Sequence, residues 1–445
     1  MRVTDSVPHF RVTRMKITAP EVSCSVSLYE RLASAISEAE ISVRRLISGS
    51  PSQFSGIHRV AQSIKDSKDA DGNAHHPAET NLAVLGDNLN ALALLFNGSR
   101  ELHMQSMRRK LKLVYIDPPF GSNSDYGFNL EGAGGRKGNA DHERIAYSDR
   151  WNGGLITYAE MLAPRLIFIR ELLRDDGSLF LHCDWHAGHY IKTMLDAIFG
   201  PENYRNEIIT GRGQKKNLQY QFPGFKSMNV AYDTLFWYSR TPDASFNPPM
   251  REAADFQMKG RWQSLWNNAD RPTLRYPLLG CSIDRGQWKW RRERSIKAAV
   301  NYEIYLREKR GTGETLEEYW QRTGMVKEFV RRNRRGRPEY WVKPRSRVIC
   351  DNNWLDLRAY DYSSGMRTQK SEMLLERILQ MGSSEGDIVA DFFAGSGTTA
   401  VVAEKMGRRW ISCDIGGAQF SLALERIRSI ARRPFSVINL ADVHS

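Results

Sequence analysis

The stretch DIVADFFAGSGTTAVVAEKMGRRWISCDIG, residues 387–416, decides the fold. It predicts a buried strand, a glycine-rich turn, a helix and a second strand, which together form one βαβ unit of an α/β protein. Gly395 and Gly397 remove Cβ atoms where the backbone has to pass close to a ligand. Thr398 and Thr399 are suited to starting the helix. The unit therefore predicts a ligand site at the turn.

Asp414, at the end of the second strand, indicates the kind of ligand. A carboxylate at this position can accept hydrogen bonds from both ribose hydroxyls of a nucleoside cofactor. A pyrophosphate-binding turn would need a third glycine in G-x-G-x-x-G, but Ala400 occupies that place. A cofactor with an uncharged linker, such as S-adenosylmethionine, fits better. We expect the cofactor to contact Asp391, Phe393, Ala394, Gly395, Ser396, Gly397 and Asp414.

A second motif, KLVYIDPPF at residues 112–120, places an acid directly after another buried strand. Ligands of open α/β sheets bind beyond the carboxyl ends of the strands, so Asp117 is expected in the crevice. Pro118 and Pro119 fix φ and make the turn rigid. This arrangement suits an enzyme that methylates the amino group of a base. Such an aromatic amine is a poor nucleophile, because its lone pair is delocalised into the ring. The Asp117 carboxylate and the Pro118 carbonyl could accept its two hydrogens and so return the lone pair to nitrogen, while Phe120 stacks on the base.

Composition bounds the class of protein. The chain has 445 residues, 41% of them hydrophobic, and a net charge of +13, which indicates a globular protein suited to a polyanionic partner. No apolar run reaches the roughly 18–20 residues that cross a bilayer, and the first ten residues lack a signal-peptide pattern. We therefore expect a cytoplasmic protein without membrane contact. The five cysteines are scattered without metal spacing, which predicts reduced thiols and no bound metal.

Four segments follow from the pattern along the chain. Residues 1–80 predict an N-terminal helical extension and a loop. Residues 81–240 and 351–445 alternate apolar strands with amphipathic helices, the pattern of a mainly parallel sheet covered on both faces. Residues 241–350, rich in Arg, Trp, Gly and Pro, predict an inserted domain. The expected strands are residues 111–116, 178–182, 207–210, 233–239, 387–392 and 409–413, and the expected helices are residues 158–173 and 188–199.

The order of the motifs, DPPF before FAGSG, resembles that of the β-class amino-methyltransferases of DNA. LAVLGDNLNALALL (residues 82–95) and TQKSEMLLERIL (residues 368–379) resemble further parts of the adenine-specific modification subunits of type III restriction systems. The resemblance implies a circularly permuted, S-adenosylmethionine-dependent methyltransferase with a Rossmann-like, seven-stranded sheet. It also implies that Asp87 approaches the cofactor adenine and that Thr368 and Lys370 border the cofactor carboxylate.

The same resemblance implies an activity, namely site-specific methylation of adenine N6 in double-stranded DNA by base flipping and direct displacement. Asp117, Pro118, Pro119 and Phe120 would then be catalytic, and residues 241–350 would recognise the target. A restriction subunit or a second copy of the chain would be a further partner. The basic run RRNRRGRP, residues 331–338, lies in the insert. We expect its arginines to contact DNA phosphates: Arg331, Arg332, Arg334 and Arg335.

Alternatives stay open at this point. Methylation of cytosine N4 is one, although cytosine enzymes of this type more often carry Ser at the position of Asp117. A second is a non-catalytic DNA-binding protein on the same fold, and a third is an NPPY-type enzyme acting on RNA or on a protein glutamine. His182, Asp184, His186 and His189 could bind a metal, but their spacing straddles a strand end and a helix start. Cys413 is interpreted as a packing residue.

Overall fold

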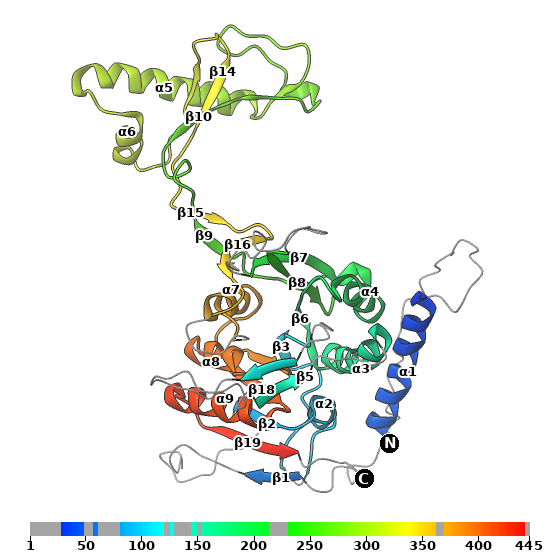
Figure 1. Ribbon diagram of the computed structural model, residues 1–445. Helices are drawn as coiled ribbons and strands as arrows, with labels where there is room; N and C mark the ends of the chain where they lie inside the picture. The colour runs from blue at the N-terminus through cyan, green and yellow to red at the C-terminus, as the bar shows by residue number, and fades with distance from the viewer. Residues whose placement is uncertain are drawn as a thin grey trace, which may run out of the picture. The chain divides into compact units, whose positions relative to one another are not determined.

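The computed structural model describes residues 28–48, 57–60, 81–100, 102–119, 125–128, 144–148, 154–212, 230–361 and 369–440. The chain forms two compact units (Figure 1). The first combines Met1–Pro249 with Asp351–Ser445, and the second is Met250–Cys350. Residues 241–249 therefore belong to the first unit, where the Asn247 amide donates to the Met381 carbonyl at 2.9 Å.

A single large sheet organises the first unit. Its ten strands, in spatial order, are β1 (Ile57–Val60), β19 (Phe435–Leu440), β2 (Asn81–Leu85), β18 (Arg409–Asp414), β17 (Ile388–Asp391), β3 (Leu111–Ile116), β6 (Leu173–Cys183), β8 (Tyr232–Ser239), β7 (Tyr204–Gly211) and β16 (Asn353–Arg358). The six from β19 to β6 are mutually parallel, and β8 is antiparallel to both of its neighbours. The mainly parallel α/β fold is confirmed. The family resemblance implies seven strands, and the described residues form ten because β1 and β19 extend the sheet at one end and β16 at the other.

The permuted order of the chain is visible in this sheet. β3 precedes β17 by most of the sequence, yet the two strands pair directly and in parallel, with Val114 beside Ala390. All six residues of β3 are buried, which explains its continuous apolar pattern. The segment that starts with Asp117 and the glycine turn therefore follow neighbouring strands of one sheet.

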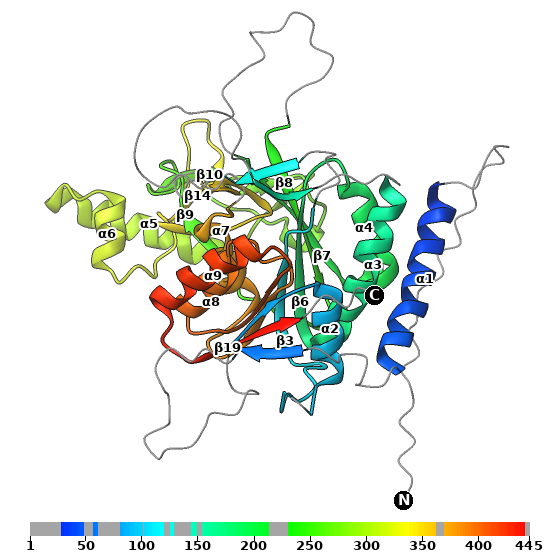
Figure 2. The ribbon, with the colours of Figure 1, turned by 60° about the horizontal axis from the view of Figure 1, so that its bottom comes forward.

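Helices cover both faces of the sheet, as Figures 1 and 2 show. The helices of one layer are α1 (Leu28–Ser48), α2 (Asn88–Asn97), α3 (Leu155–Leu172) and α4 (Gly188–Phe199). Those of the other are α7 (Glu372–Gly382), α8 (Thr398–Lys405) and α9 (Gly417–Ile430). α1 packs on α3, so α3 is buried against both the sheet and a second helix. This explains why the α3 sequence is apolar on several sides. The buried residues of α1 recur at helical spacing: Leu32, Ala35, Ile36, Ala39 and Val43.

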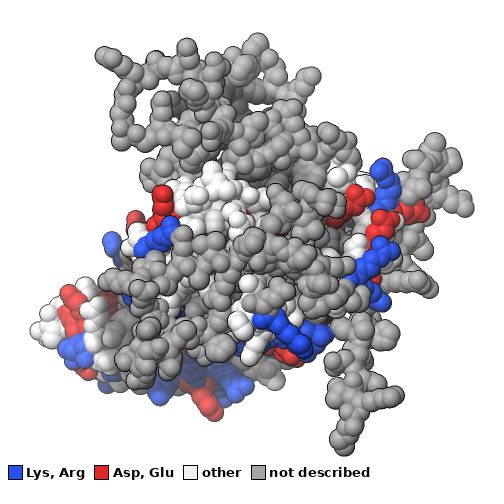
Figure 3. Space-filling model, turned by 90° about the horizontal axis from the view of Figure 1, so that it is seen from below, with Lys and Arg blue, Asp and Glu red and all other residues white. Residues whose placement is uncertain are grey.

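Smaller elements surround the core of the first unit. A separate hairpin pairs β4 (Asp125–Phe128) with β5 (Arg144–Ser148), and a 3-10 turn spans Pro201–Asn203. In the part of the chain that the structure describes, no helix is long and apolar enough to cross a membrane. On the face seen in Figure 3, Lys or Arg side chains lie next to Asp or Glu side chains.

The second unit has its own sheets and cores. β9 (Met250–Glu252) pairs with β15 (Arg347–Ile349), β14 (Pro338–Val342) lies between β10 (Arg261–Ser264) and β13 (Val330–Arg332), and β11 (Trp266–Asn267) pairs with β12 (Gln287–Trp288). A 3-10 turn (Pro272–Leu274) and the helices α5 (Arg292–Thr312) and α6 (Leu316–Arg322) complete it. The larger aromatic core gathers Tyr305, Tyr319, Trp320, Phe329 and Trp341. Most of the tryptophans of this segment are therefore packing residues.

One buried carboxylate joins three parts of the first unit. Glu404 on α8 is 5% exposed and accepts hydrogen bonds from Asn81 Nδ2 at 2.9 Å and Trp410 Nε1 at 2.9 Å. Its other oxygen accepts from the backbone amide of Arg432 at 2.8 Å. The carboxylate thus connects the first residue of β2, the second residue of β18 and the segment that leads into β19.

We expect Glu404→Ala to lower the free energy of unfolding by about 2–4 kcal/mol, because it leaves two buried side-chain donors and one partly buried amide without their acceptor. Urea denaturation followed by circular dichroism would measure the loss. Glu425→Ala is the matched control, since Glu425 is exposed on α9 and should change stability by less than about 0.5 kcal/mol. Equal stabilities of the two variants would contradict this role of Glu404.

Candidate active site

The carboxyl ends of neighbouring parallel strands meet at one edge of the sheet. Asp391 is the last residue of β17 and pairs with Ser412 of β18, whose own last residue is Asp414. On the other side of β17, β3 ends at Ile116, and Asp117 follows. The structure therefore brings together three acids that the sequence separates widely, and it places them where α/β sheets bind ligands.

The glycine turn after β17 is held by two of these acids. Asp391 accepts hydrogen bonds from the Phe393 amide at 3.0 Å and from the Thr399 hydroxyl at 2.6 Å. Asp414 accepts from the Gly395 amide at 2.7 Å and from the Gly416 amide at 2.8 Å. The two carboxylates thus fix the turn from both sides.

The two glycines of the turn have different reasons to be glycine. Both have positive φ, +51° for Gly395 and +74° for Gly397. A Cβ on Gly397 would lie 2.7 Å from Cβ of Ala423, so this glycine permits close packing of α9. A Cβ on Gly395 would meet nothing within 4 Å, so the backbone at Gly395 faces open space that a ligand can enter.

The remaining turn residues are also fixed. The Ala394 amide donates to the Cys413 carbonyl at 3.0 Å. Ser396 is 6% exposed, and its carbonyl accepts from Arg426 Nη1 at 2.8 Å. Phe393 packs against the main core. Cys413 lies buried in that core, and burial raises the pKa of its thiol well above the usual value.

The residues on either side of Asp87 hold it beside the glycine turn. The Gly86 amide donates to the Asp414 carbonyl at 3.0 Å, and Asn88 Nδ2 donates to the Phe392 carbonyl at 2.7 Å. Asp87 itself caps α2 by accepting from the Leu89 amide at 2.8 Å. These bonds place the turn before α2 against the ends of β17 and β18.

Sequence reasoning missed the cation that holds Asp87. Arg165 on α3 donates from Nη2 to the second Asp87 oxygen at 2.8 Å, and from Nε to Asn88. No local pattern marks this arginine as the partner of Asp87, because the two residues are far apart in the sequence. Ile415, 68% exposed directly after Asp414, was also missed, and it offers an apolar surface at the same edge.

Asp117 has a buried partner that the sequence does not reveal. Lys370 Nζ lies 3.0 Å from Asp117 Oδ1, and the two side chains are 6% and 22% exposed. Tyr360 holds the lysine from the other side, since its backbone forms an antiparallel bridge with Lys370 and its ring centre lies 4.0 Å from Nζ. The structure thus pairs Lys370 with Asp117. Phe120 and Thr368 lie outside the described residues.

A series of buried polar side chains in contact with one another lies next to the end of β3. The Tyr115 hydroxyl lies 3.0 Å from His182 Nδ1, and His182 Nε2 lies 3.4 Å from Asp233 Oδ2. Arg212 pairs with the other oxygen of Asp233. Burial lowers the pKa of His182, while hydrogen bonding to His182 holds the pKa of Asp233 well below its usual value.

Asp184 and His186 are engaged in the same series of contacts, whereas His189 is exposed on α4. Asp184 Oδ2 lies 2.7 Å from His186 Nδ1 and accepts from Arg212 Nη2 at 3.1 Å. Among the described residues, no group of three or more His, Cys, Asp or Glu side chains is arranged to hold a metal ion. The segment is thus part of a polar network at the end of β6.

The basic run of the second unit forms a tight turn between β13 and β14. Arg331 is not at its tip, because its Nε pairs with Glu339 at 2.6 Å and its guanidinium lies 4.0 Å from the Trp262 ring centre. Arg332, Arg334 and Arg335 are exposed. Arg337, also exposed in this turn, was not among the predicted contacts.

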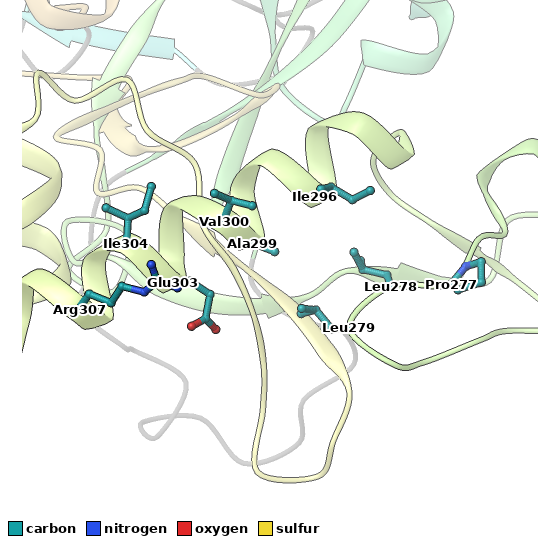
Figure 4. Close-up of a pocket in the computed structure, with 9 residues that line it drawn as sticks. All are labelled: Pro277, Leu278, Leu279, Ile296, Ala299, Val300, Glu303, Ile304 and Arg307. Carbon is teal, nitrogen blue, oxygen red and sulfur yellow. The ribbon is translucent and has the colours of Figure 1, made fainter.

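The second unit also carries a mostly apolar pocket of about 410 Å³ (Figure 4). None of the expected catalytic or cofactor residues lines it. Its walls come from α5 and from the segment before it: Pro277, Leu278, Leu279, Ile296, Ala299, Val300, Glu303, Ile304 and Arg307. It is therefore separate from the glycine turn.

Comparison with known proteins identifies the family. The model described as DNA methylase matches residues 111–425, which is more than half of the chain and includes both motifs. The chain belongs to this DNA methylase family. The resemblance drawn from DPPF and FAGSG is confirmed.

Two curated relatives show the range of similar proteins. The type II methyltransferase M.EcaI of Enterobacter cloacae is 27% identical over 320 residues, covering 69% of this chain and 62% of the relative. The probable type III restriction-modification enzyme HindVI Mod subunit of Haemophilus influenzae is 25% identical over 421 residues, covering 80% of this chain and 51% of the relative. The chain thus matches only part of the length of these relatives.

Solved structures of methyltransferases are also similar. The cytosine-N4-specific PvuII DNA methyltransferase is 14% identical with a TM-score of 0.41, covering 79% of this chain and 89% of that chain. A putative DNA modification methylase of Thermus thermophilus, complexed with S-adenosyl-L-methionine, is 14% identical with a TM-score of 0.40. This second match covers 82% of this chain and 100% of that chain.

Asp391 gives the site a pH dependence. Burial raises the pKa of this carboxyl to about 7, although its hydrogen bonds from Thr399 and Phe393 act in the opposite direction. A carboxyl whose pKa is higher in the folded chain than the ordinary value of about 3.9 binds its proton more tightly in the folded state. Stability from this group is therefore complete at low pH and is lost as the pH rises through about 7.

We expect Asp391→Asn to remove this dependence, because the amide does not ionise; its oxygen can accept from the Phe393 amide and its nitrogen can donate to the Thr399 hydroxyl. The free energy of unfolding of the parent minus that of the variant should fall by about 2–3 kcal/mol between pH 5 and pH 8. Denaturation at several pH values would measure it, with Asp255→Asn, an exposed aspartate of the second unit, as control. A difference that stays constant over this range would contradict the raised pKa.

Proposed function

We propose that this chain transfers a methyl group from S-adenosylmethionine to N6 of adenine in double-stranded DNA. The observation that carries the proposal is the placement of Asp117, paired with Lys370, beside a glycine turn whose Gly395 faces open space. A hydrogen-bond acceptor for the target amine and a turn whose backbone a cofactor can approach closely thus follow adjacent strands. Membership of the DNA methylase family supports the reaction class.

The residues around the glycine turn fit S-adenosylmethionine. Asp414 uses one oxygen for each of two backbone amides, and an ionised carboxylate has further lone pairs for ribose hydroxyls. Ile415 offers exposed apolar surface for an adenine ring. The turn itself is shaped by Asp391, Ser396 and Gly397, so these residues contribute indirectly to binding of S-adenosylmethionine.

The chemistry assigned to the chain is positioning. When bound, S-adenosylmethionine supplies an electrophilic methyl group. Asp117 and the Pro118 carbonyl would accept the two amino hydrogens, so that the nitrogen lone pair turns towards the cofactor side of the edge. Because Lys370 occupies Oδ1 of Asp117, Oδ2 is the oxygen that would receive the amine. The rigid Pro118–Pro119 turn keeps that oxygen in place, and Phe120 would stack on the base.

DNA binding and target choice are assigned to the second unit. Arg332, Arg334 and Arg335 are exposed at one tight turn, and Arg337 joins them. Exposed arginines of this kind suit contacts with phosphates, which fix register without reading sequence. Arg331 instead braces the hairpin through Glu339 and Trp262. A cytoplasmic location and a restriction subunit or second copy as partner belong to the same proposal.

The proposal is tested by the product. Incubation of the protein with duplex DNA and labelled S-adenosylmethionine, followed by digestion to nucleosides and mass spectrometry, should yield N6-methyladenine. We expect Asp117→Ala to lower kcat by at least about 100-fold, since the acid receives the target amine. The affinity for S-adenosylmethionine measured by calorimetry should stay within about twofold, because Asp117 faces the base.

Other products would decide against the adenine assignment. N4-methylcytosine would show cytosine specificity. Methylated RNA or protein without methylated DNA would show that DNA is not the substrate. Full turnover by Asp117→Ala would remove Asp117 from the reaction.

Lys370 gives a sharper test of the same site. If it orients Asp117, Lys370→Ala should lower kcat by about 10-fold or more while the affinity for S-adenosylmethionine changes little. Lys370→Arg should recover part of kcat, because a guanidinium can reach the same oxygen. A large loss of cofactor affinity with unchanged kcat would instead assign Lys370 to the cofactor carboxylate, as the motif resemblance implies.

A further inference from the structure

Trp185 is a large aromatic side chain left exposed at the catalytic edge. It follows β6 by two residues, since that strand ends at Cys183, and 53% of its surface is exposed. Single exposed apolar residues are common on proteins and need no explanation by themselves. The setting of this one is unusual, because several contacts fix its orientation.

The indole of Trp185 stacks on His186, and hydrogen bonds fix the position of His186. The rings of Trp185 and His186 stack with centroids 3.9 Å apart and an angle of 27° between their planes. His186 is tied to Asp184 twice, by its ring at 2.7 Å and by its amide at 2.9 Å. Asp184 is 3% exposed and accepts from Arg212 Nη2 at 3.1 Å. The exposed indole is therefore oriented by a chain of contacts that ends in the sheet.

The strand order places this indole on the substrate side of the acceptor. β3 lies between β17, which carries the glycine turn, and β6, which leads to Trp185. Ile116 of β3 pairs with Leu181 of β6, so Asp117 leaves the edge beside His182. Neighbouring parallel strands lie about 4.8 Å apart. A base that presents its amine to Asp117 therefore has the cofactor turn on one side and the Trp185 turn on the other.

We infer that Trp185 is a stacking platform for the extruded target base. The inference rests on the proposed function, because it requires a nucleobase at Asp117. Aromatic side chains bind unstacked bases through their π-faces, and an oriented indole does so without an ordering cost. His186 and Asp184 are positioning residues, and Arg212 connects them to the strands that support Tyr115 and Asp117.

The test uses the full chain with a duplex that contains a target site identified by methylation-sensitive sequencing of DNA treated with the protein. Loss of one stacked base corresponds to roughly a 5- to 100-fold change in binding. We therefore expect Trp185→Ala to raise KM for DNA by at least about fivefold, with the affinity for S-adenosylmethionine unchanged. Trp185→Phe should recover most of the loss, because a phenyl ring also stacks.

A second readout reports the stacking itself. With 2-aminopurine in place of the target adenine, the parent complex should show emission quenched by the indole, and the Trp185→Ala complex should be brighter. The matched control is Tyr29→Ala, which removes another exposed aromatic of the same unit, 56% exposed on α1. This control should leave KM and emission unchanged.

The outcomes separate the two proposals. If the parent methylates DNA and Trp185→Ala keeps both its KM and the quenched emission, the stacking role is wrong while the proposed function stands. If the penalty of Trp185→Ala persists in binding to a duplex with an abasic target position, Trp185 does not contact the target base. If the parent methylates no DNA, the proposed function itself fails.

Discussion

The parallel pairing of β17 with β3 is the contact on which the rest of the site depends. Val114 lies beside Ala390, so the residues that follow these strands emerge at the same edge although they are far apart in the sequence. Since the pairing is parallel, both carboxyl ends point the same way. Without it, Asp117 and the Gly395 turn would not share a crevice, and neither motif alone would define a reaction.

An edge with so many acids has to compensate each of them. Asp117 is paired with Lys370, and Asp87 is paired with Arg165. Asp414 instead accepts hydrogen bonds from backbone amides, and burial raises the pKa of the Asp391 carboxyl. Unpaired buried carboxylates would be costly, and several together would repel one another.

The sequence predicted the central strands well, because a buried strand needs a continuous apolar run. The residues expected at 111–116 coincide with β3, and the helix expected at 188–199 coincides with α4. Four strands, β1, β2, β16 and β19, were not among the expected ones; β1 and β16 form the two edges of the sheet, where a strand needs less apolar sequence. The pairing of Lys370 with Asp117, and the role of Arg165 as partner of Asp87, could not be found from the sequence, because these contacts cross the fold and leave no local pattern.

The second unit shows how an insertion can be tolerated in the middle of a sheet protein. Its ends, β9 and β15, pair with each other in antiparallel fashion, so the chain leaves and returns at neighbouring points. Its aromatic cores include Tyr319 and Trp341, so these large side chains stabilise the insert. Because the insert has its own cores, the residues of its exposed arginine turn can change without disturbing the packing that holds Asp117. Under the proposed function, the choice of target can therefore vary while the chemistry at the sheet edge is kept.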